Sequence, residues 1–313
     1  MPELILHHYA GSPFSQKVRL ILGFKGLAWH SVIVPSVMPK PDAVALTGGY
    51  RRTPFMQIGA DVYCDTTLMC RVIDALKPEP PLYPMATAGI ADIVAQWADT
   101  QLFWTAVPFT LQPAGVTHVL KDATPEMLKA FAVDRAAMNP NMRRPTVADG
   151  AAALHTYLAR LEHLLCDGRP FLLGALASIA DFSAAQSVWF IHLAPPVAAV
   201  LEAYPKVEAW YRRVDDFGQG SFTKMKSAEA IDVAAQAASR GEHAPVSFSA
   251  EPGLAPGDEV SVTPTDYAHD AVTGRLVGLG SQEVVIARSD ERAGTLHVHF
   301  PRIAFQIKKL QPN

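Results

Sequence analysis

The sequence predicts three consecutive parts, namely a small α/β layer, an all-helical region and a short all-β tail. Up to about residue 77, short β-type runs alternate with amphipathic helical stretches. From residue 86 to about 238 the chain carries Ala-rich and Leu-rich segments of helical period, broken by prolines. From residue 245 onward, short strand-like runs are separated by Gly, Asp, Pro and Ser. The 313 residues suffice for about two domains plus an appendage.

The first part reads as β-α-β followed by β-β-α, the order of a small α/β layer domain. Gly26 is well placed to stop the first helix, and Pro78 follows the end of the second. We expect this domain to span residues 1–78. Its expected elements are a strand at 4–8, a helix at 13–25, a strand at 28–34, a hairpin of 55–58 with 62–64, and a helix at 66–76.

A proline-rich stretch, residues 79–84, separates this layer from the helical region. Because proline lacks the N–H that helices and sheet ladders need, we expect the stretch to be an interdomain linker. Residues 85–240 then read as an all-helical domain of five or more helices.

The tail, residues 245–313, reads as a small β domain whose strand spacing resembles an SH3-like barrel. It carries 8 acidic residues against 6 Lys or Arg, so we do not expect it to be a basic nucleic-acid-binding domain. The sequence assigns it no role. Its expected strands are 260–262, 274–278, 283–288, 295–300 and 304–308.

The composition excludes several classes of protein. Apolar residues make up 49% and charged residues 18%, which is typical of a globular chain. A net charge of −3 argues against a nucleic-acid partner. Three cysteines without paired spacing argue against a disulfide framework. The N-terminus lacks a signal-peptide pattern and no apolar run is long enough to cross a bilayer, so we expect a cytoplasmic protein without a membrane partner.

Three short motifs stand where strands meet helices. At the first, Ser12 takes the N-cap position and Pro13 the first helical turn. This can be a simple helix cap, or a hydroxyl and free amides that hold an anion such as a thiolate. At the second, Pro54 follows Thr53 and precedes a strand, either as an edge-strand proline or as a cis peptide. At the third, Asp65 with Thr66 opens a helix, and capping is again the simple explanation.

Taken in this order and spacing, the three motifs resemble those of the glutathione transferase family. Residues 178–181, Ser-Ile-Ala-Asp, resemble the Ser/Thr-x-x-Asp helix-capping motif of that family. Residues 204–210 resemble its late Tyr-Pro-x-x-x-x-Trp helix. The likeness covers roughly residues 1–240 and implies a thioredoxin-like first domain that binds glutathione, followed by a helical domain that shapes the pocket for a second substrate.

The resemblance also implies a role for Ser12, which matches the position that is Ser in zeta-like classes and Cys in omega-like ones. Its hydroxyl would donate a hydrogen bond to the glutathione sulfur and favour the thiolate, whose ordinary pKa is about 8.5. Ser15, one helical turn later, and Tyr9, near the place where other classes use Tyr, are the alternatives. A Ser rather than a Cys disfavours mixed-disulfide chemistry.

The other motifs match the family's cofactor-binding residues. Thr53 matches the residue before the family's cis-proline, and the backbone N–H and C=O of that residue pair with the cysteinyl unit of glutathione. Pro54 matches the proline that fixes this geometry. Asp65 and Thr66 match the pair that holds the γ-glutamyl ammonium and carboxylate. Either Arg52 or Lys40 could reach the glycyl carboxylate, although Arg and Lys at the surface are usually just solvated.

Some further residues invite either a functional or a structural interpretation. Trp97, Gln101 and Trp104 lie at helical spacing on one stripe, which the resemblance places beside the substrate pocket, while core packing explains both tryptophans equally well. His297 and His299 would share one face of a strand, but no third ligand is evident and we expect no metal.

Three more residues have a structural interpretation. His7 and His8 point to opposite faces of a strand, which favours packing over metal binding. Cys64, beside the expected ligand-binding carboxylate, reads as a buried structural thiol.

We therefore expect a glutathione transferase that activates the thiol of reduced glutathione against a small electrophilic substrate, by conjugation of the kind used in detoxification or by glutathione-dependent isomerisation. The resemblance implies a homodimer. The rival interpretation is a non-catalytic glutathione-binding protein that works through its β tail, because the family's fold does not need that tail. The sequence does not identify the electrophile.

Overall fold

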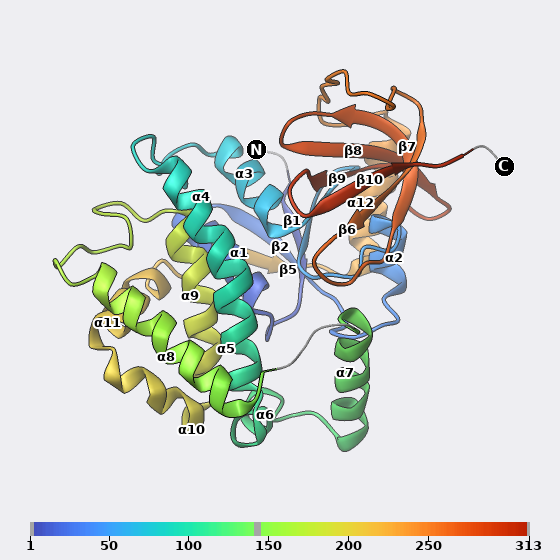
Figure 1. Cartoon of the computed structure of the whole chain (residues 1–313). Helices are drawn as coiled ribbons and strands as arrows, with labels where there is room; N and C mark the ends of the chain where they lie inside the picture. Colours follow the sequence, from blue (N-terminus) through green and yellow to red (C-terminus); the bar gives the residue numbers. More distant parts are fainter. Residues whose placement is uncertain (1–2, 141–144, 312–313) are drawn as a thin grey trace.

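The strands of the first layer and of the tail form one continuous sheet. The computed structural model describes residues 3–140 and 145–311. Its ten strands run in the order β10-β6-β7-β8-β9-β4-β3-β1-β2-β5. Figure 1 shows the helical region on one side of this sheet and the tail strands at the other end.

The first layer follows the expected order and adds one helix. The hairpin strands and the second expected helix lie where the sequence predicts them, while a short helix, α2, was not expected; it ends at Gly48 in the left-handed conformation. The elements are β1 (Ile5–His8), α1 (Pro13–Phe24), β2 (Ala28–Ile33), α2 (Pro41–Thr47), β3 (Phe55–Ile58), β4 (Asp61–Cys64) and α3 (Thr66–Leu76).

The helical region packs around α9 (Ile179–His192), which is buried along nearly its whole length. This arrangement confirms the expected helical domain. Among the described residues no single helix is long and apolar enough to span a bilayer; α9 with residues 195–203 passes only as a pair bent by 118°. The other helices are α4 (Ala88–Trp97), η1 (Ala98–Leu102), α5 (Phe103–Thr110), α6 (Pro113–Val119), α7 (Pro125–Met138), α8 (Val147–Leu164), α10 (Pro195–Ala198), η2 (Ala199–Ala203) and α11 (Pro205–Asp215).

A buried carboxylate fixes the start of α9. Asp181 Oδ2 accepts hydrogen bonds from the backbone N–H and hydroxyl of Ser178, completing a capping box. Its Oδ1 accepts from the Leu172 backbone N–H and from Trp210 Nε1, both at 2.8 Å. Because Asp181 is fully buried, these four donors replace the water it loses on folding.

A second buried pair joins the first layer to the helical region. Lys17 on α1 donates to Asp99 Oδ2 on η1 at 2.6 Å, and Lys17 is 1% exposed. Gln186 on α9 donates to the other oxygen of Asp99 at 2.6 Å. One carboxylate therefore ties α1, η1 and α9 together.

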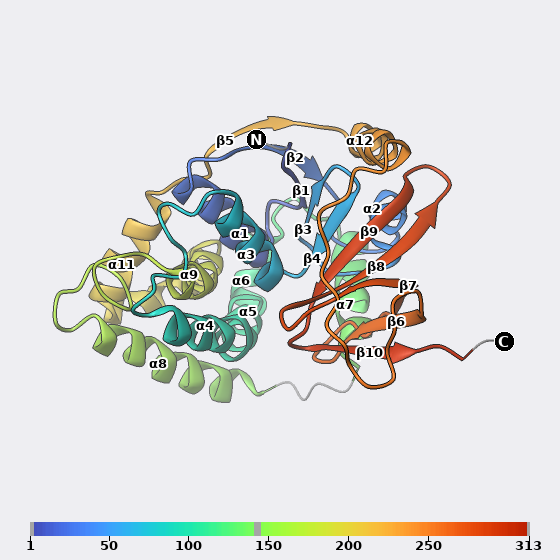
Figure 2. The ribbon, with the colours of Figure 1, turned by 90° about the horizontal axis from the view of Figure 1, so that it is seen from above.

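A strand and a helix that follow the helical region return to the first layer. β5 (Ser221–Lys224) pairs parallel with β2, and α12 (Ser227–Ser239) packs against α2 and β9. Figure 2 shows β5 beside β2 at the end of the sheet, with α12 following it at the top of the view. The division into 1–78, 79–84, 85–240 and 245–313 stays a prediction. Within it, β5 and α12 fall in the expected helical domain although they pack on the first layer.

The tail forms five antiparallel strands in the order β10-β6-β7-β8-β9. A β-bulge between Leu276 and Gly278 bends the sheet where β7 meets β8. The β tail is confirmed, while an SH3-like barrel stays a prediction. The strands are β6 (Glu259–Pro264), β7 (Val272–Leu279), β8 (Glu283–Asp290), β9 (Gly294–Pro301) and β10 (Phe305–Lys309).

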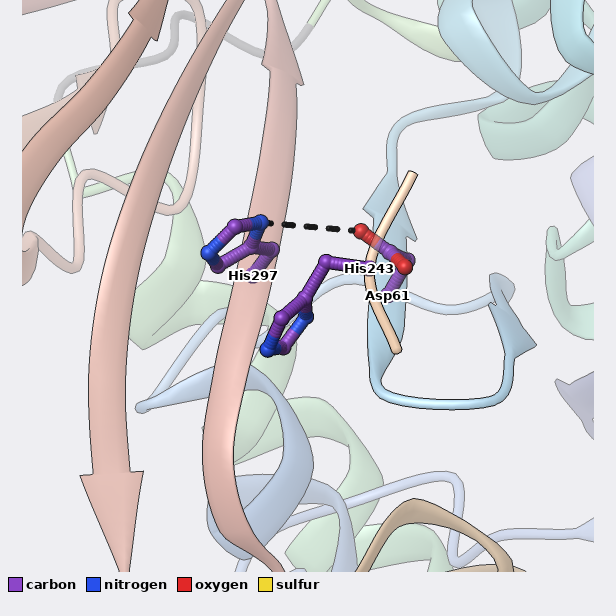
Figure 3. Close-up of side chains that lie close together, drawn as sticks. All are labelled: Asp61, His243 and His297. Atoms are coloured by element: carbon purple, nitrogen blue, oxygen red, sulfur yellow. Dashed lines mark ion pairs between the residues drawn. The ribbon is translucent and has the colours of Figure 1, made fainter. Parts of the chain in front are cut away.

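Strand β9 joins the tail to the first layer by pairing parallel with β4. In this register Asp61 lies opposite His297 and Tyr63 opposite His299. Asp61 Oδ1 accepts from His299 Nε2 at 2.8 Å. The same oxygen lies 3.9 Å from His297 Nδ1 (Figure 3). The junction is therefore partly polar, although apolar side chains of β4 and β9 share one core.

The two histidines of β1 are buried on opposite faces of the sheet, as expected. His7 stacks on Phe55 and bonds to Gln57 at 2.9 Å, and burial lowers the pKa of His7 to about 4. His8 bonds to Ser31 at 2.8 Å and to Arg19 at 3.1 Å. Burial, with the Arg19 charge, lowers the pKa of His8 to about 3.

We expect Asp181→Ala to lower the free energy of unfolding by about 3 kcal/mol, because four buried donors lose their acceptor. Urea denaturation followed by circular dichroism measures the change. Asp167→Ala, which removes a carboxylate from an exposed loop, is the matched control and leaves the midpoint unchanged. An Asp181→Ala midpoint equal to that of the control would contradict this role.

The buried histidines predict acid sensitivity. Both pKa values are lower in the folded chain than the ordinary 6.5, so the unfolded chain binds more protons below pH 6.5. Stability is fully present above pH 6.5 and falls as the pH drops toward 4, by about 1.4 kcal/mol per pH unit for each histidine. Urea titrations between pH 7 and 5 measure this slope. His7→Asn should reduce the slope by about that amount, and His118→Asn, at an exposed position, should not.

Candidate functional site

Strand register brings the three predicted motifs to one edge of the sheet. His7 of β1 pairs with Phe55 of β3, and Phe55 pairs with Cys64 of β4. The end of β1, the start of β3 and the end of β4 therefore lie side by side. Ser12 follows the first of these points and Asp65 the last.

Ser12 caps α1 and lies just beneath the surface. Its Oγ accepts from the Ser15 backbone N–H at 3.2 Å, and Ser12 is 2% exposed. The first turn of α1 carries no carboxylate, so the helix dipole there is not neutralised locally. Ser15 is fully buried, and its Oγ has no hydrogen-bond partner among the described residues. Both hydroxyls remain candidates for an anion contact.

Asp65 and Thr66 open α3, and Thr53 lies across the edge from them. Asp65 Oδ1 accepts from the Thr67 backbone N–H at 2.9 Å, with Asp65 at a φ of 74°. The peptide between Thr53 and Pro54 is cis. Lys40 Nζ donates to Thr53 Oγ1 at 2.9 Å, and burial lowers the pKa of Lys40 to about 8.

Arg52 reaches into the tail. Its guanidinium pairs with Asp266 and donates to the Tyr267 backbone oxygen. It also lies 3.7 Å from Asp65 Oδ2. Because Asp266 and Tyr267 belong to the loop of residues 265–271, between β6 and β7, this loop contacts the edge where the motifs meet. We call it the tail loop.

The ring of Tyr267 packs between the first layer and the helical region. The Arg52 guanidinium lies 3.8 Å from the ring centroid, close enough for a cation–π contact. Trp104 on α5 meets the same ring edge-to-face at 5.2 Å. Burial raises the pKa of Tyr267 to about 12, and the charges that act on it include Arg52, Asp65 and Tyr9. Residues of the first layer and of the helical region therefore surround one tail side chain.

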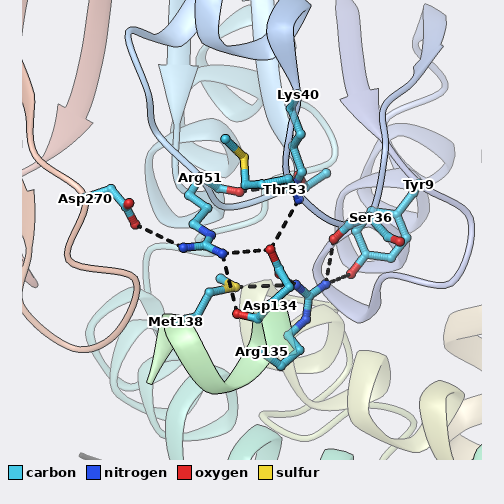
Figure 4. A network of polar contacts seen from close by, with 10 residues as sticks. Tyr9, Ser36, Lys40, Arg51, Thr53, Asp134, Arg135, Met138 and Asp270 are labelled. Carbon is cyan, nitrogen blue, oxygen red and sulfur yellow. Dashed lines mark hydrogen bonds and ion pairs between the residues drawn. The ribbon is translucent and has the colours of Figure 1, made fainter. Parts of the chain in front are cut away.

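The C-terminal turns of α7 hold the same region from the other side (Figure 4). Asp134 accepts from Arg51 Nη2 at 2.7 Å and from the Met38 backbone N–H at 3.2 Å. Arg135 donates to the Ser36 backbone oxygen at 3.0 Å and to the Tyr9 hydroxyl at 3.4 Å.

The tail loop is attached to α7 as well. The Ala268 backbone N–H donates to the Met138 backbone oxygen at 2.7 Å. Arg51 Nη1 lies 4.0 Å from Asp270 Oδ2. The loop is thus fixed at both α7 and Arg52.

The expected stripe of Trp97, Gln101 and Trp104 is divided. A π-helical turn, η1, intervenes and changes the residue spacing on which the stripe depended. Trp97 packs edge-to-face on Tyr157 of α8, and Gln101 is exposed. Trp104 lies by the tail loop, next to a row of rings that includes Phe103.

Several residues of this region were not expected from the sequence. Asp266, Tyr267 and Asp134 lie far along the chain from the motifs, in a turn and on a helix without a motif of their own. The basic pair Arg51 and Arg52 directly before the Thr-Pro motif was the one local signal, and it did not indicate their partners.

Burial raises the pKa of the Cys64 thiol, which fits the structural role expected for it.

Two family models match this chain. Residues 6–81 match the family model described as glutathione S-transferase, N-terminal domain. Residues 144–213 match the family model described as glutathione S-transferase, C-terminal domain. The first match covers the whole sheet edge described above.

Solved and curated relatives extend the comparison. FtsZ-localized protein A of Caulobacter vibrioides is 25% identical over 217 residues, or 68% of this chain and 86% of that protein. Its structure, FzlA from C. crescentus, superposes with a TM-score of 0.50 over 68% of this chain and 88% of that one. A glutathione S-transferase from Rhodospirillum rubrum shares the fold at 22% identity, with a TM-score of 0.52 over 68% of this chain and 87% of its own.

One similar structure spans the tail as well. The crystal structure of a GST-like protein from Pseudomonas syringae is 41% identical, with a TM-score of 0.82. It covers 99% of this chain and 100% of its own. The tail and its junction with the first layer therefore belong to a shared architecture. With both family models matched and this relative aligned over its full length, the chain belongs to the glutathione S-transferase family.

Proposed function

We propose that this chain binds reduced glutathione at the sheet edge and that Ser12 activates its thiol. The observation that carries the proposal is the strand register that gathers Ser12, Thr53 and Asp65 at one edge. The N-termini of α1 and α3 both face this edge, and each favours negative charge. The first suits a thiolate and the second the γ-glutamyl carboxylate.

The reaction follows from the chemistry of the thiolate. Ser12 donates its hydroxyl proton as a hydrogen bond to the sulfur, which stabilises the thiolate while the thiol proton goes to solvent. The sulfur then forms a bond to an electrophilic carbon, and the leaving group departs with the electron pair. The row of rings from Phe14 through Phe103 to Trp104 supplies an apolar wall for that electrophile.

The proposal includes displacement of the tail loop. The carboxylate of Asp266 forms an ion pair with the Arg52 guanidinium. Arg52 is also the cation best placed to bind a carboxylate of the tripeptide. Tyr267 covers the edge beside Asp65 and Tyr9. Glutathione therefore has to compete with the chain's own loop, and the covered form is the resting form.

The rival function is a non-catalytic interaction protein that works through its tail. Two observations favour it, namely the loop that binds Arg52 and the likeness to a protein named for localisation to FtsZ. A homodimer, a cytoplasmic location, and conjugation as opposed to isomerisation stay predictions. Turnover separates the two functions, because a binding protein accelerates no reaction of the thiol.

We expect Ser12→Ala to lower kcat/KM for an activated aryl halide by about 100-fold, because the sulfur loses its donor. The pKa of the bound thiol should rise toward its ordinary value of about 8.5, seen in the pH dependence of thiolate absorbance. Binding of glutathione, measured by calorimetry, should change little. Ser15→Ala is the competing variant, and loss of turnover in it with retention in Ser12→Ala would assign the role to Ser15.

We expect Asp266→Ala to tighten glutathione binding about tenfold, because the covered form loses its ion pair with Arg52. Calorimetry on the full chain measures the dissociation constant. Asp270→Ala, in the same loop but 4.0 Å from Arg51, is the matched control and should change it little. Weaker or unchanged binding in Asp266→Ala would show that the loop does not compete with glutathione.

A further inference from the structure

Three ligand-type side chains meet at the junction of the tail and the first layer. Asp61 begins β4, His297 lies on β9, and His243 belongs to the segment after α12 (Figure 3). One potential ligand atom from each residue lies within 4.8 Å of the other two. The sequence could not indicate this group, because no two of its members are near neighbours along the chain.

Both imidazoles carry an unused nitrogen. The Nδ1 atoms of His243 and His297 are buried and have no hydrogen-bond partner in the described parts of the chain. The two rings stack at 3.8 Å with 17° between their planes. A buried polar atom without a partner costs roughly 1–3 kcal/mol. These two nitrogens and the neighbouring carboxylate could all bind a cation.

The carboxylate is held in place by residues that would not themselves bind the ion. Asp61 Oδ1 accepts from His299 Nε2 at 2.8 Å, and Oδ2 accepts from the Ala244 backbone N–H at 2.8 Å. The second bond also fixes the residue next to His243. His299 Nδ1 lies 3.3 Å from Glu283. Outer contacts of this kind orient the ligands in metal sites.

An open cavity adjoins the cluster. It has a volume of about 590 Å³, and its lining includes Asp61 and His243 together with Glu242 and Arg240. The cavity gives an ion a path from solvent and gives a water molecule room as an additional ligand. Two imidazoles and one carboxylate match the three protein ligands of a tetrahedral zinc site, in which a water takes the fourth position.

We propose that Asp61, His243 and His297 bind a divalent cation of the zinc type at the junction of β4 and β9. Imidazole nitrogen favours zinc over magnesium and calcium, which prefer oxygen ligands. The ion joins three separate segments, so it fastens the tail to the first layer. The stacked rings separate slightly to let both nitrogens reach the ion. None of its three ligands belongs to the proposed glutathione site.

The test uses the full chain stripped of metal with a chelator, in a Cys166→Ser background that removes the exposed thiol. Calorimetric titration with zinc chloride should give saturable binding of one ion per chain, and magnesium chloride should give none. Zinc should also raise Tm by several degrees, because it binds the folded chain. His243→Ala and His297→Ala should each weaken zinc binding about 30-fold or more, and His118→Ala should not.

Two outcomes overturn the proposal. One is the absence of saturable zinc binding, which would leave the two rings as a stacked pair of neutral imidazoles. The other is zinc binding that survives both histidine substitutions. If His297→Ala fails to fold, His243→Ala decides the matter, because residue 243 lies outside every helix and strand. Circular dichroism of each variant checks the fold.

Discussion

The parallel pairing of β4 with β9 is the contact on which the arrangement of this molecule depends. Without the tail, β4 would be the edge strand of the first layer and would expose unpaired backbone groups. β9 covers that edge with three residue pairs, from Asp61 with His297 to Tyr63 with His299. Apolar residues of both strands then enter a common core with α2 and α12. The tail is therefore part of the sheet.

This attachment decides how strongly the tail loop can hold the site. An exposed ion pair between free molecules is worth little, because solvent screens it and both side chains lose freedom. Asp266 is not free, since its loop connects two strands whose sheet is fixed to β4. Its effective concentration at Arg52 is therefore that of an intramolecular partner, and a free tripeptide competes at a disadvantage. The backbone bond from Ala268 to Met138 adds a second point of attachment.

The sequence predicted the features that depend on local signals. Pro13 and the Ser12 cap define the start of α1, the hairpin of β3 and β4 lies within one residue of its expected bounds, and Asp181 caps α9 as the motif indicates. Contacts between distant segments were not predictable. Arg52 and Asp266 are 214 positions apart, so no window of sequence contains both. The π-helical turn at 98–102 was also missed, because a regular helical period was assumed there.

The two proposed centres lie at the two ends of β4. Asp61 begins the strand and Asp65 follows it, four residues later, or about 13 Å along an extended chain. An ion held by Asp61 and His297 binds only when β9 lies on β4, and that is also the arrangement that carries the tail loop to Arg52. Whatever stabilises the junction therefore also holds in place the sheet that carries the tail loop. Both centres therefore depend on the same strand and the same attached tail.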